Sequence, residues 1–335
     1  MILTQHGISS LQHNAPVWKL GRDYSFYVNH ASPYHIKTPE QYAALCYISN
    51  GLWATDTEYC PEEITATDNF GNKIVHIDND LVFNLNYENN FDWMEMNESN
   101  NNKYVNPPEN DCTLLRLNFN GTIEGNFHRI LGLFYYQSVE SSASFGNGVV
   151  INNCSGTIKN IYFENCCWKN YKQGMCALFK GDCRLENLQM RHCKLICSTK
   201  TSGSWGSVQF AALVVGSANL YGCGIVDSQI LLSDPTGYGS YRYNGLHIGT
   251  NNGSGKATND YNESVHVNKY SSGYQFSRGP IEYCIHYNVS GQVNRQGTQA
   301  LSRADLIEKH NSYRDNVSLK LDADLRYIPG QLTGS

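Results

Sequence analysis

The sequence predicts an all-β protein: a right-handed parallel β-helix (solenoid) with an N-terminal attachment segment and a short C-terminal cap. Three observations lead to this fold class: the composition, a repeated eleven-residue pattern, and a second pattern that recurs in step with it. The chain of 335 residues holds 37 Asn, 29 Gly and 23 Tyr, but only 16% charged residues. Asn and Gly favour turns, Tyr favours strands, and the strong helix formers Lys, Glu and Arg are scarce. The composition therefore favours sheet over long helices.

The eleven-residue pattern occurs three times, beginning at Ile158, Leu185 and Leu220. Its first, fourth, sixth and eleventh positions are apolar and its ninth is small. Such repeats are typical of solenoids, because each coil buries its apolar side chains only by stacking on the next. The alignment predicts three inward columns, formed by Ile161, Leu188 and Cys223, by Phe163, Met190 and Ile225, and by Trp168, Leu195 and Ile230.

Two further features of the repeat have structural interpretations. Asn160, Asn187 and Gly222 share the third position, where a corner requires residues that tolerate a left-handed backbone. We interpret Asn160 and Asn187 as a structural ladder. Trp168 aligns with Leu195, so we expect it in the core and not on a ligand platform.

The second pattern occupies residues 177–181, 212–216 and 245–249. Successive copies of the first pattern are 27 and 35 residues apart, and the stretch between the two patterns accounts for the difference. Residues inserted there are therefore expected to stack on one side of the solenoid. The insertions run from Lys169 to Met175, from Ser198 to Val208 and from Ser233 to Tyr243.

The insertions combine aromatic residues with Gly and Ser. An aromatic ring gives a large rigid contact and its polar atom a hydrogen bond, which suits sugar or protein surfaces. The alternative is that the rings pack back on the wall and hold the loops. At about 4.8 Å per coil, they are expected along one edge that several sugars of an extended chain can follow. The candidate ligand-binding residues are Tyr171, Trp205, Tyr238, Tyr241 and Tyr243.

Several runs of the chain resemble a known repeat family. The runs are 36–45, 71–74, 119–125, 130–133 and 156–161. They are similar to the GLUG-type β-helix repeats of bacterial surface adhesins over about residues 36 to 250, although several family glycines are replaced and loops such as 87–110 are longer. The resemblance implies a β-helix with inserted loops over 36–250. The two ends fall outside it, and we expect an attachment segment over 1–35 and last coils with a cap or oligomerisation tail over 251–335. The resemblance leaves function open, because β-helices host adhesion, capping and polysaccharide cleavage.

The first eleven residues resemble the short N-terminal segment of fibre-like virion proteins from phages of gut Bacteroidales. That resemblance implies other virion proteins as partners and a homotrimer, since fibre-like β-helix proteins are commonly trimers. The start of the chain has neither a positive n-region nor a continuous apolar stretch, so we expect assembly in a host cytoplasm. The residues implied in virion attachment are Ile2, Leu3, His6, Ile8 and Leu11.

Residues 300–335 form a separate tail. Ser302 to His310 reads as a short helix with Ser302 as its N-cap. Val317 to Asp324 alternates like a strand, which could cover the open end of the solenoid or pair with another subunit.

Charge and hydropathy exclude two classes of partner. The net charge of −5 provides no clustered cations for nucleic acid. The longest apolar stretch, 210–215, is far shorter than the roughly 20 residues of a spanning helix, so no membrane insertion is expected.

The twelve cysteines contain no C-x-x-C spacing, which argues against a zinc site. We expect core-packing thiols and no cofactor, with disulfides or metal as the alternative. Cys166 and Cys193 are expected as stacked wall residues, where a Ser replacement costs about 1–3 kcal/mol if its hydroxyl finds no partner.

No nucleophile, metal-protease or phosphate-loop motif is present. Glycan cleavage would require two carboxylates on one face. Glu164, Asp227 and Asp234 lie on or beside the repeat, and their ordinary interpretation is solvated surface carboxylates. Whether the chain is an enzyme stays open.

Three functions are compatible with these observations. The leading hypothesis is a non-enzymatic phage virion protein, a head or tail fibre subunit that displays loops to host-surface glycans. The second is a β-helix polysaccharide depolymerase. The third is an exported bacterial adhesin.

Overall fold

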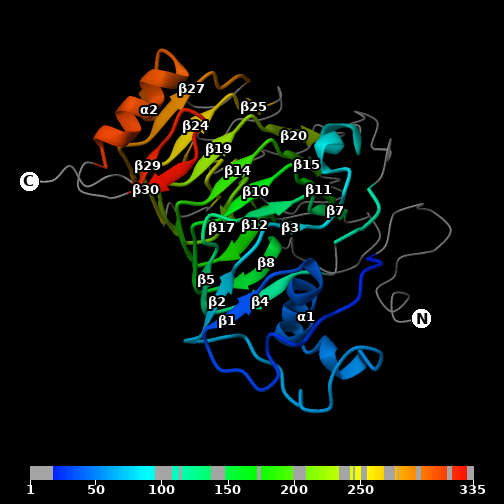
Figure 1. Ribbon diagram of the computed structural model, residues 1–335. Coiled ribbons are helices and arrows are strands. Elements are labelled where there is room, and N and C mark those ends of the chain that lie inside the picture. Colours follow the sequence, from blue (N-terminus) through cyan, green and yellow to red (C-terminus); the bar gives the residue numbers. More distant parts are fainter. Residues whose placement is uncertain are drawn as a thin grey trace, which may run out of the picture.

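The computed structural model describes most of the chain. The described residues are 18–94, 108–112, 115–136, 148–171, 175–198, 209–233, 242–243, 246–249, 255–267, 276–277, 279–291, 296–314 and 319–329. Within them the protein consists mostly of strands in parallel sheets, with few helices (Figure 1). The predicted all-β class is confirmed at this level.

Four parallel sheets hold all but two of the described strands. Sheet 1 contains, in spatial order, β1 (Tyr34–Ile36), β2 (Ile74–Ile77), β5 (Thr122–Glu124), β9 (Thr157–Lys159), β13 (Arg184–Glu186), β18 (Asn219–Tyr221), β23 (Lys256–Thr258) and β26 (Ile281–Glu282). Sheet 2 contains β3 (Leu81–Val82), β6 (Arg129–Leu131), β10 (Tyr162–Glu164), β14 (Gln189–Arg191), β19 (Gly224–Val226), β24 (Tyr261–Glu263), β27 (Ile285–Tyr287) and β28 (Thr298–Gln299).

Sheets 3 and 4 are shorter. Sheet 3 contains β7 (Phe134–Tyr136), β11 (Cys167–Tyr171), β15 (Lys194–Ser198), β20 (Gln229–Ser233) and β25 (His266–Val267). Sheet 4 contains β4 (Leu117–Phe119), β8 (Gly148–Cys154), β12 (Met175–Gly181), β16 (Gln209–Phe210), β17 (Val214–Val215), β21 (Arg242–Tyr243) and β22 (Ile248–Gly249).

The chain visits the four sheets in a fixed order. β9, β10, β11 and β12 lie in sheets 1, 2, 3 and 4, and β13 to β16 return to the same sheets in the same order. We call one such round a passage. Equivalent strands of neighbouring passages pair in parallel, so that Met190 lies opposite Phe163 on one side and Ile225 on the other. The predicted alignment of the eleven-residue pattern is confirmed.

The aligned apolar positions form the core, because the sheets turn the same side of each strand inward. All nine residues of the three predicted columns are at most 1% exposed. Trp168 is completely buried, so its assignment to the core is confirmed.

Each passage bends at two residues with left-handed backbone. Between sheets 1 and 2, φ is 55° at Asn160, 50° at Asn187 and 66° at Gly222, which confirms the predicted corner. Nδ2 of Asn187 donates to Oδ1 of Asn160 at 2.8 Å, so the predicted ladder is present. The residues with positive φ after the strands of sheet 2 are Gly132, Asn165, His192, Asp227, Ser264 and Asn288.

The second pattern is confirmed in its first two copies and shifted by one residue in the third. Phe179 pairs with Val214 as aligned, but Val214 then pairs with Ile248 and not with His247. We attribute the shift to the polar contacts of His247. Its imidazole lies in the interior, 2.9 Å from both Asp260 Oδ2 and Asn262 Oδ1.

A helix interrupts the region expected to hold only repeat strands. α1 (Pro39–Asn50) begins after Thr38, whose Oγ1 accepts a hydrogen bond from the Gln41 amide at 3.2 Å. Pro39 fits the first turn because that position needs no amide hydrogen. α1 lies beside β4 at the end of the sheets where β1 begins (Figure 1), and the short 3₁₀ helix η2 (Leu52–Thr55) follows it. α1 thus covers this end of the core.

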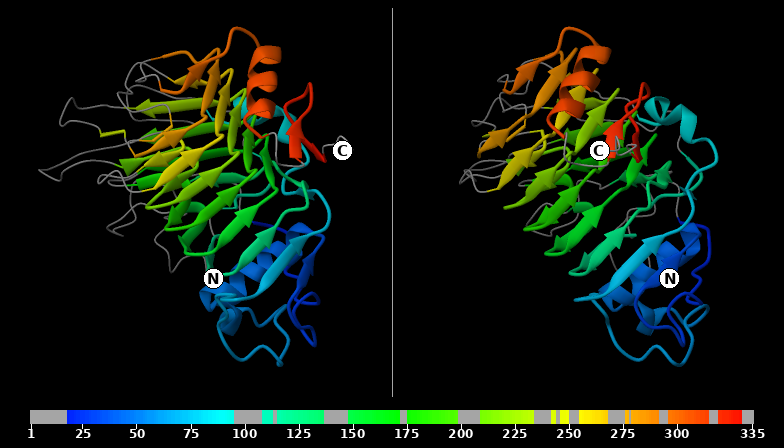
Figure 2. Two further views of the ribbon diagram at one scale, coloured as in Figure 1. Left: turned by 90° about the vertical axis from the view of Figure 1, so that its left-hand side faces the viewer. Right: turned by 60° about the vertical axis from the view of Figure 1, so that its left-hand side comes forward.

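The predicted C-terminal helix and strand are both present. α2 (Arg303–Ser312) begins after Ser302, whose Oγ accepts from the Asp305 amide at 3.1 Å. β29 (Leu319–Leu321) and β30 (Tyr327–Pro329) form an antiparallel hairpin. Both views of Figure 2 place α2 and the hairpin along the side of sheet 2. We refer to residues 300–314 and 319–329 as the C-terminal segment; it covers a flank of the sheet.

Ten cysteines have described side chains; all ten are free thiols, and all of them except Cys60 are buried. Sγ of Cys166 lies 3.5 Å from the Ile130 carbonyl, and Sγ of Cys193 lies 3.4 Å from the Phe163 carbonyl. Each thiol also lies near a carbonyl of its own passage, that of Glu164 at 3.4 Å for Cys166 and that of Arg191 at 3.1 Å for Cys193. The expected burial of Cys166 and Cys193 is confirmed.

Candidate functional site

The candidate recognition site lies where sheet 3 gives way to sheet 4. Tyr171, Ser198 and Ser233, the last residues of β11, β15 and β20, are paired with one another in register. The next strands, in sheet 4, also begin in register, because Met175 pairs with Gln209 and Gln209 with Arg242. The chain therefore leaves sheet 3 and enters sheet 4 at stacked positions, about 4.8 Å apart. The first insertion begins after Tyr171 and not at Lys169 as predicted, because Lys169 still pairs with Ile196.

Two more insertions have flanking strands at this boundary. Tyr136 of β7 pairs with Lys169, and Gly148 of β8 pairs with Ala177, which brackets residues 137–147. Val267 of β25 pairs with Ile230, and Ser277 bridges Ile248, which brackets residues 268–275. Neither was predicted, because both fall outside the three copies of the pattern. Their signal is the same mixture of Ser, Gly and aromatic residues, with Phe145, Tyr270 and Tyr274.

The structure places only part of the predicted site. Tyr171 ends β11 and Tyr243 ends β21, so their backbones lie on either side of the boundary. The residues that lie outside the described part of the chain are Trp205, Tyr238 and Tyr241 of the ligand-binding set and Ile2, Leu3, His6, Ile8 and Leu11 of the attachment set.

The outer face of sheet 3 is covered by residues 87–94, which contain the 3₁₀ helix η3 (Tyr87–Asp92). Lys194 Nζ donates to the Phe91 carbonyl at 2.9 Å, and Asn90 Nδ2 donates to the His192 carbonyl at 2.7 Å. The apolar contacts under this cover join Trp93, Met94, Phe134, Cys167, Ile196 and Leu231. The described beginning of the long loop 87–110 is therefore structural.

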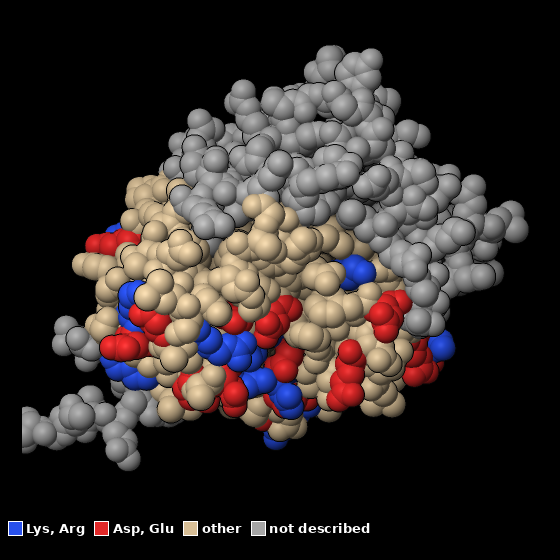
Figure 3. Space-filling view, turned by 90° about the horizontal axis from the view of Figure 1, so that it is seen from above, with Lys and Arg blue, Asp and Glu red and all other residues tan. Residues whose placement is uncertain are grey.

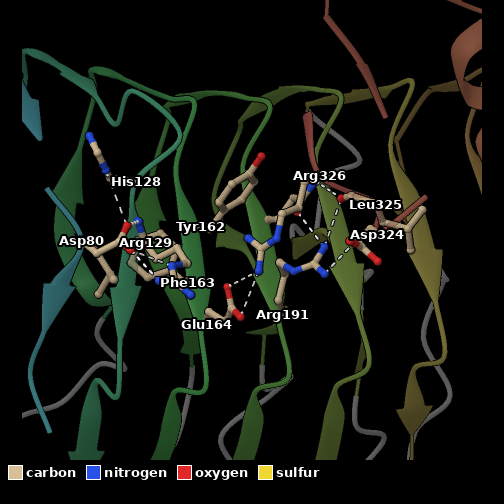
Figure 4. Close-up of polar contacts among 12 residues, drawn as sticks. Asp80, His128, Arg129, Tyr162, Phe163, Glu164, Arg191, Asp324, Leu325 and Arg326 are labelled. Atoms are coloured by element: carbon tan, nitrogen blue, oxygen red, sulfur yellow. Dashed lines mark hydrogen bonds and ion pairs between the residues drawn. The ribbon is translucent and has the colours of Figure 1, made fainter. Parts of the chain in front are cut away.

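The outer face of sheet 2 carries a row of charged side chains (Figure 4). Arg129 binds Asp80 through Nε at 2.8 Å and Nη2 at 2.6 Å. Burial would raise the pKa of Asp80, but the hydrogen bonds from Arg129 outweigh burial and hold that pKa below its usual value. Arg191 donates to the carbonyls of Leu325 and Asp324 at 3.0 and 2.9 Å. These arginines bind their own chain.

The carboxylates considered for glycan cleavage are engaged in ion pairs. Glu164 lies 2.9 Å from Arg326. Asp227 lies 3.4 Å from Arg303, which also binds Glu263 at 3.0 Å. Asp234 lies outside the described residues. Glu164 and Asp227 therefore anchor the C-terminal segment.

A buried polar group occupies the interior beneath β24. His247, Asp260 and Asn262 are all 0% exposed, and Asp260 Oδ1 accepts from the Cys223 amide at 2.8 Å. Burial raises the pKa of Asp260, and the contact with His247 partly offsets this. Because these three side chains have no access to solvent and contact one another, we interpret them as a structural part of the core.

Within the described ranges, no cluster of three or more His, Cys, Asp or Glu side chains could hold a metal ion. No described helix has the length and apolar character to span a bilayer. Seen from above, acidic and basic side chains are intermingled (Figure 3). Comparisons with family models, curated proteins and solved structures find no match.

Proposed function

We propose that the passages wind as a right-handed parallel β-helix and that the protein is a non-enzymatic adhesion subunit of a phage virion, which binds an extended host-surface glycan. The observation that carries this proposal is the register of the insertion boundaries. Since Tyr171, Ser198 and Ser233 are stacked, each passage contributes one loop to the same edge.

An edge of this kind suits a polymer. Each passage advances by about 4.8 Å, which lets several loops meet one glycan chain. The insertion sequences supply Tyr171, Trp205, Tyr238, Tyr241 and Tyr243, separated by Gly and Ser. Stacking of a ring on a sugar is weak for one contact, but contacts to a linked chain add in effect.

Adhesion is favoured over cleavage by the state of the described carboxylates. Glu164 and Asp227 face arginines of the same chain, whereas a glycosidase needs two carboxylates aimed at the glycosidic bond. Incubation with host capsular polysaccharide should therefore release no reducing ends. Release of reducing ends would replace this proposal with a depolymerase.

The virion part of the proposal is supported by the resemblance of residues 1–11 to fibre-like virion proteins. In this proposal the N-terminus binds other virion proteins, the chain assembles as a homotrimer, and the protein ends up in the virion. Light scattering of the complete chain should give the mass of a trimer. A single monomeric species would contradict the trimer.

The test of the recognition edge uses two variants, Trp205→Ala and Tyr241→Ala. Each should weaken binding to host cells by about tenfold, the equivalent of roughly 1.4 kcal/mol, and leave the melting temperature unchanged. The alternative, rings that pack on the wall, predicts a lower melting temperature with unchanged adsorption.

The matched control is Tyr283→Ala. Tyr283 is 54% exposed and lies at the bend between sheets 1 and 2, away from the insertion boundary. It should bind like the wild type. A stability loss without a binding loss in both edge variants would end the proposal for this edge.

A further inference from the structure

The C-terminal segment is held on sheet 2 around a buried histidine. Its helix and hairpin bury an apolar patch against the outer face of the sheet, and the patch contains Val226, Tyr261, Ile285, Ala300, Leu306, Leu321, Leu325 and Tyr327. His310 of α2 is 0% exposed beneath this patch. Its Nε2 lies 3.2 Å from Oη of Tyr327, whose hydroxyl also contacts the Gly222 carbonyl.

Gly222 provides the socket for this arrangement. A Cβ atom at position 222 would clash with Nη1 of Arg314 and would lie 2.8 Å from Oη of Tyr327. Nη2 of Arg314 donates to Oδ1 of Asn187 at 3.0 Å, and its guanidinium lies over the rings of Tyr221 and Tyr327. Because Gly222 has no side chain, the guanidinium of Arg314 fits beside this corner of the sheet.

The surroundings of His310 disfavour a positive charge. It faces Arg314, which follows the end of α2, and Lys320 of β29, and from β24 and β30 it faces Tyr261 and Tyr327. Among the described residues, no carboxylate forms a hydrogen bond or ion pair with it. Burial, followed by the two cations, holds the pKa of His310 well below its usual value of about 6.5.

Asp260 is a buried carboxyl whose pKa depends in part on Arg314 of the C-terminal segment. Burial raises its pKa, and the positive charge of Arg314 acts in the opposite direction. Removal of Arg314 would therefore raise the proton affinity of Asp260. Protonation of Asp260 and of His310 both become easier when the C-terminal segment leaves.

We propose that the C-terminal segment is an acid-released clamp on the flank of sheet 2. When docked, His310 is neutral between two aromatic rings and two cations. When released, the same imidazole is in water and takes up a proton below pH 6.5. Because the released state binds more protons, docking is strongest above pH 6.5 and weakens as the pH falls through that value. One proton per release event corresponds to about a tenfold weakening per pH unit.

The test is hydrogen exchange of the full chain, followed by mass spectrometry between pH 7.5 and 5.0 and corrected for the intrinsic exchange rate. Peptides covering α2, β29 and β30 should lose protection by roughly tenfold or more at pH 5.0, while those covering β11 and β15 keep theirs. A pH of 5.0 lies above the ordinary pKa values of Asp and Glu, about 3.9 and 4.3, so most surface carboxylates stay charged.

His310→Gln removes the titration and keeps a side chain that can hydrogen-bond the Tyr327 hydroxyl. Its C-terminal segment should lose most of its pH dependence, and what remains reports the protonation of Asp260. His266→Gln is the control, because His266 is an exposed histidine on β25. It should keep the wild-type pH dependence. Equal pH dependence in wild type and His310→Gln would overturn the proposal, as would full protection of the wild-type segment at pH 5.0.

A second measurement serves the case in which His310→Gln fails to dock at pH 7.5. The imidazole proton resonances of the wild-type protein report the charge of His310 directly. They should stay in the neutral position for as long as the segment is protected. A His310 that becomes charged near pH 6.5 while α2 remains protected would contradict the clamp.

Discussion

Sheet 2 and sheet 3 each have an outer face covered by another segment of the chain, and the two covers are attached by different chemistry. Over sheet 3, Trp93 and Met94 pack on apolar side chains, and the Lys194 ammonium donates to a neutral carbonyl, that of Phe91. Over sheet 2, the C-terminal segment uses Arg303, Arg314 and Arg326 around an apolar patch. Apolar contacts respond little to pH or salt, whereas charges respond to both. We therefore expect the cover of sheet 3 to be insensitive to pH and salt, and the cover of sheet 2 to be sensitive to both.

The largest effect is expected over sheet 3. Trp93→Ala removes a completely buried side chain and should lower the free energy of unfolding by about 3–5 kcal/mol at any pH from 5 to 8. Denaturant unfolding measures this change. Leu85→Ala, at a residue that is 86% exposed, is the control and should change stability by less than about 0.5 kcal/mol. A small or strongly pH-dependent effect of Trp93→Ala would contradict an apolar cover.

An intermediate effect is expected at the socket of sheet 2. Gly222→Ala strains a backbone with φ of 66° and clashes with Arg314, so it should weaken docking by about 1–3 kcal/mol. Hydrogen exchange should show loss of protection in α2 and β30 but not in η3. Gly71→Ala is the matched control, because its nearest contact lies 3.4 Å away, at Oδ1 of Asn69. Unchanged protection in Gly222→Ala would show that docking of the C-terminal segment does not depend on Gly222.

The smallest effect is expected at the ion pair of Glu164 and Arg326. The two side chains are 15% and 32% exposed, so Glu164→Gln should weaken the C-terminal segment by about 1 kcal/mol or less. The effect should shrink between 0.05 and 0.5 M salt because salt screens the pair. An effect that is independent of salt would indicate that this contact is steric.

The sequence predicts the described strands well where apolar residues recur in step. Phe163, Met190 and Ile225 share a column because each must avoid water, and the corner at Asn160 follows from backbone sterics. Both depend on the residue itself and on its repeat. These are local properties that a sequence expresses directly.

Other features depend on partners far along the chain. The shift at His247 requires Asp260 and Asn262, which no spacing rule connects to it. Arg314 and Asn187 meet across 127 residues. The helix at Pro39, in contrast, had a local signal: Thr38 and Gln41 form the N-terminal pattern of a capped helix, and the repeat resemblance obscured it.

The cost expected for a serine at Cys166 also changes once partners are known. A carbonyl of the preceding passage lies 3.5 Å from its sulfur. Ser228 occupies the equivalent position two passages later, and its hydroxyl donates to the Val226 carbonyl at 2.7 Å. A buried hydroxyl therefore finds a partner in this column, and the penalty of about 1–3 kcal/mol for an unpartnered group does not apply.

The absence of a side chain at Gly222 has a consequence for how many passages the protein can contain. In the column of Asn160, Asn187, Gly222, Asn259 and Tyr283, only one described position lacks a side chain. A tail that met identical corners could dock one passage higher or lower with similar contacts. Gly222 therefore fixes which passage the C-terminal segment docks on. The segment is positioned by this internal corner and not by the last passage. A protein built this way can gain a passage before residue 123 without moving its tail relative to Gly222.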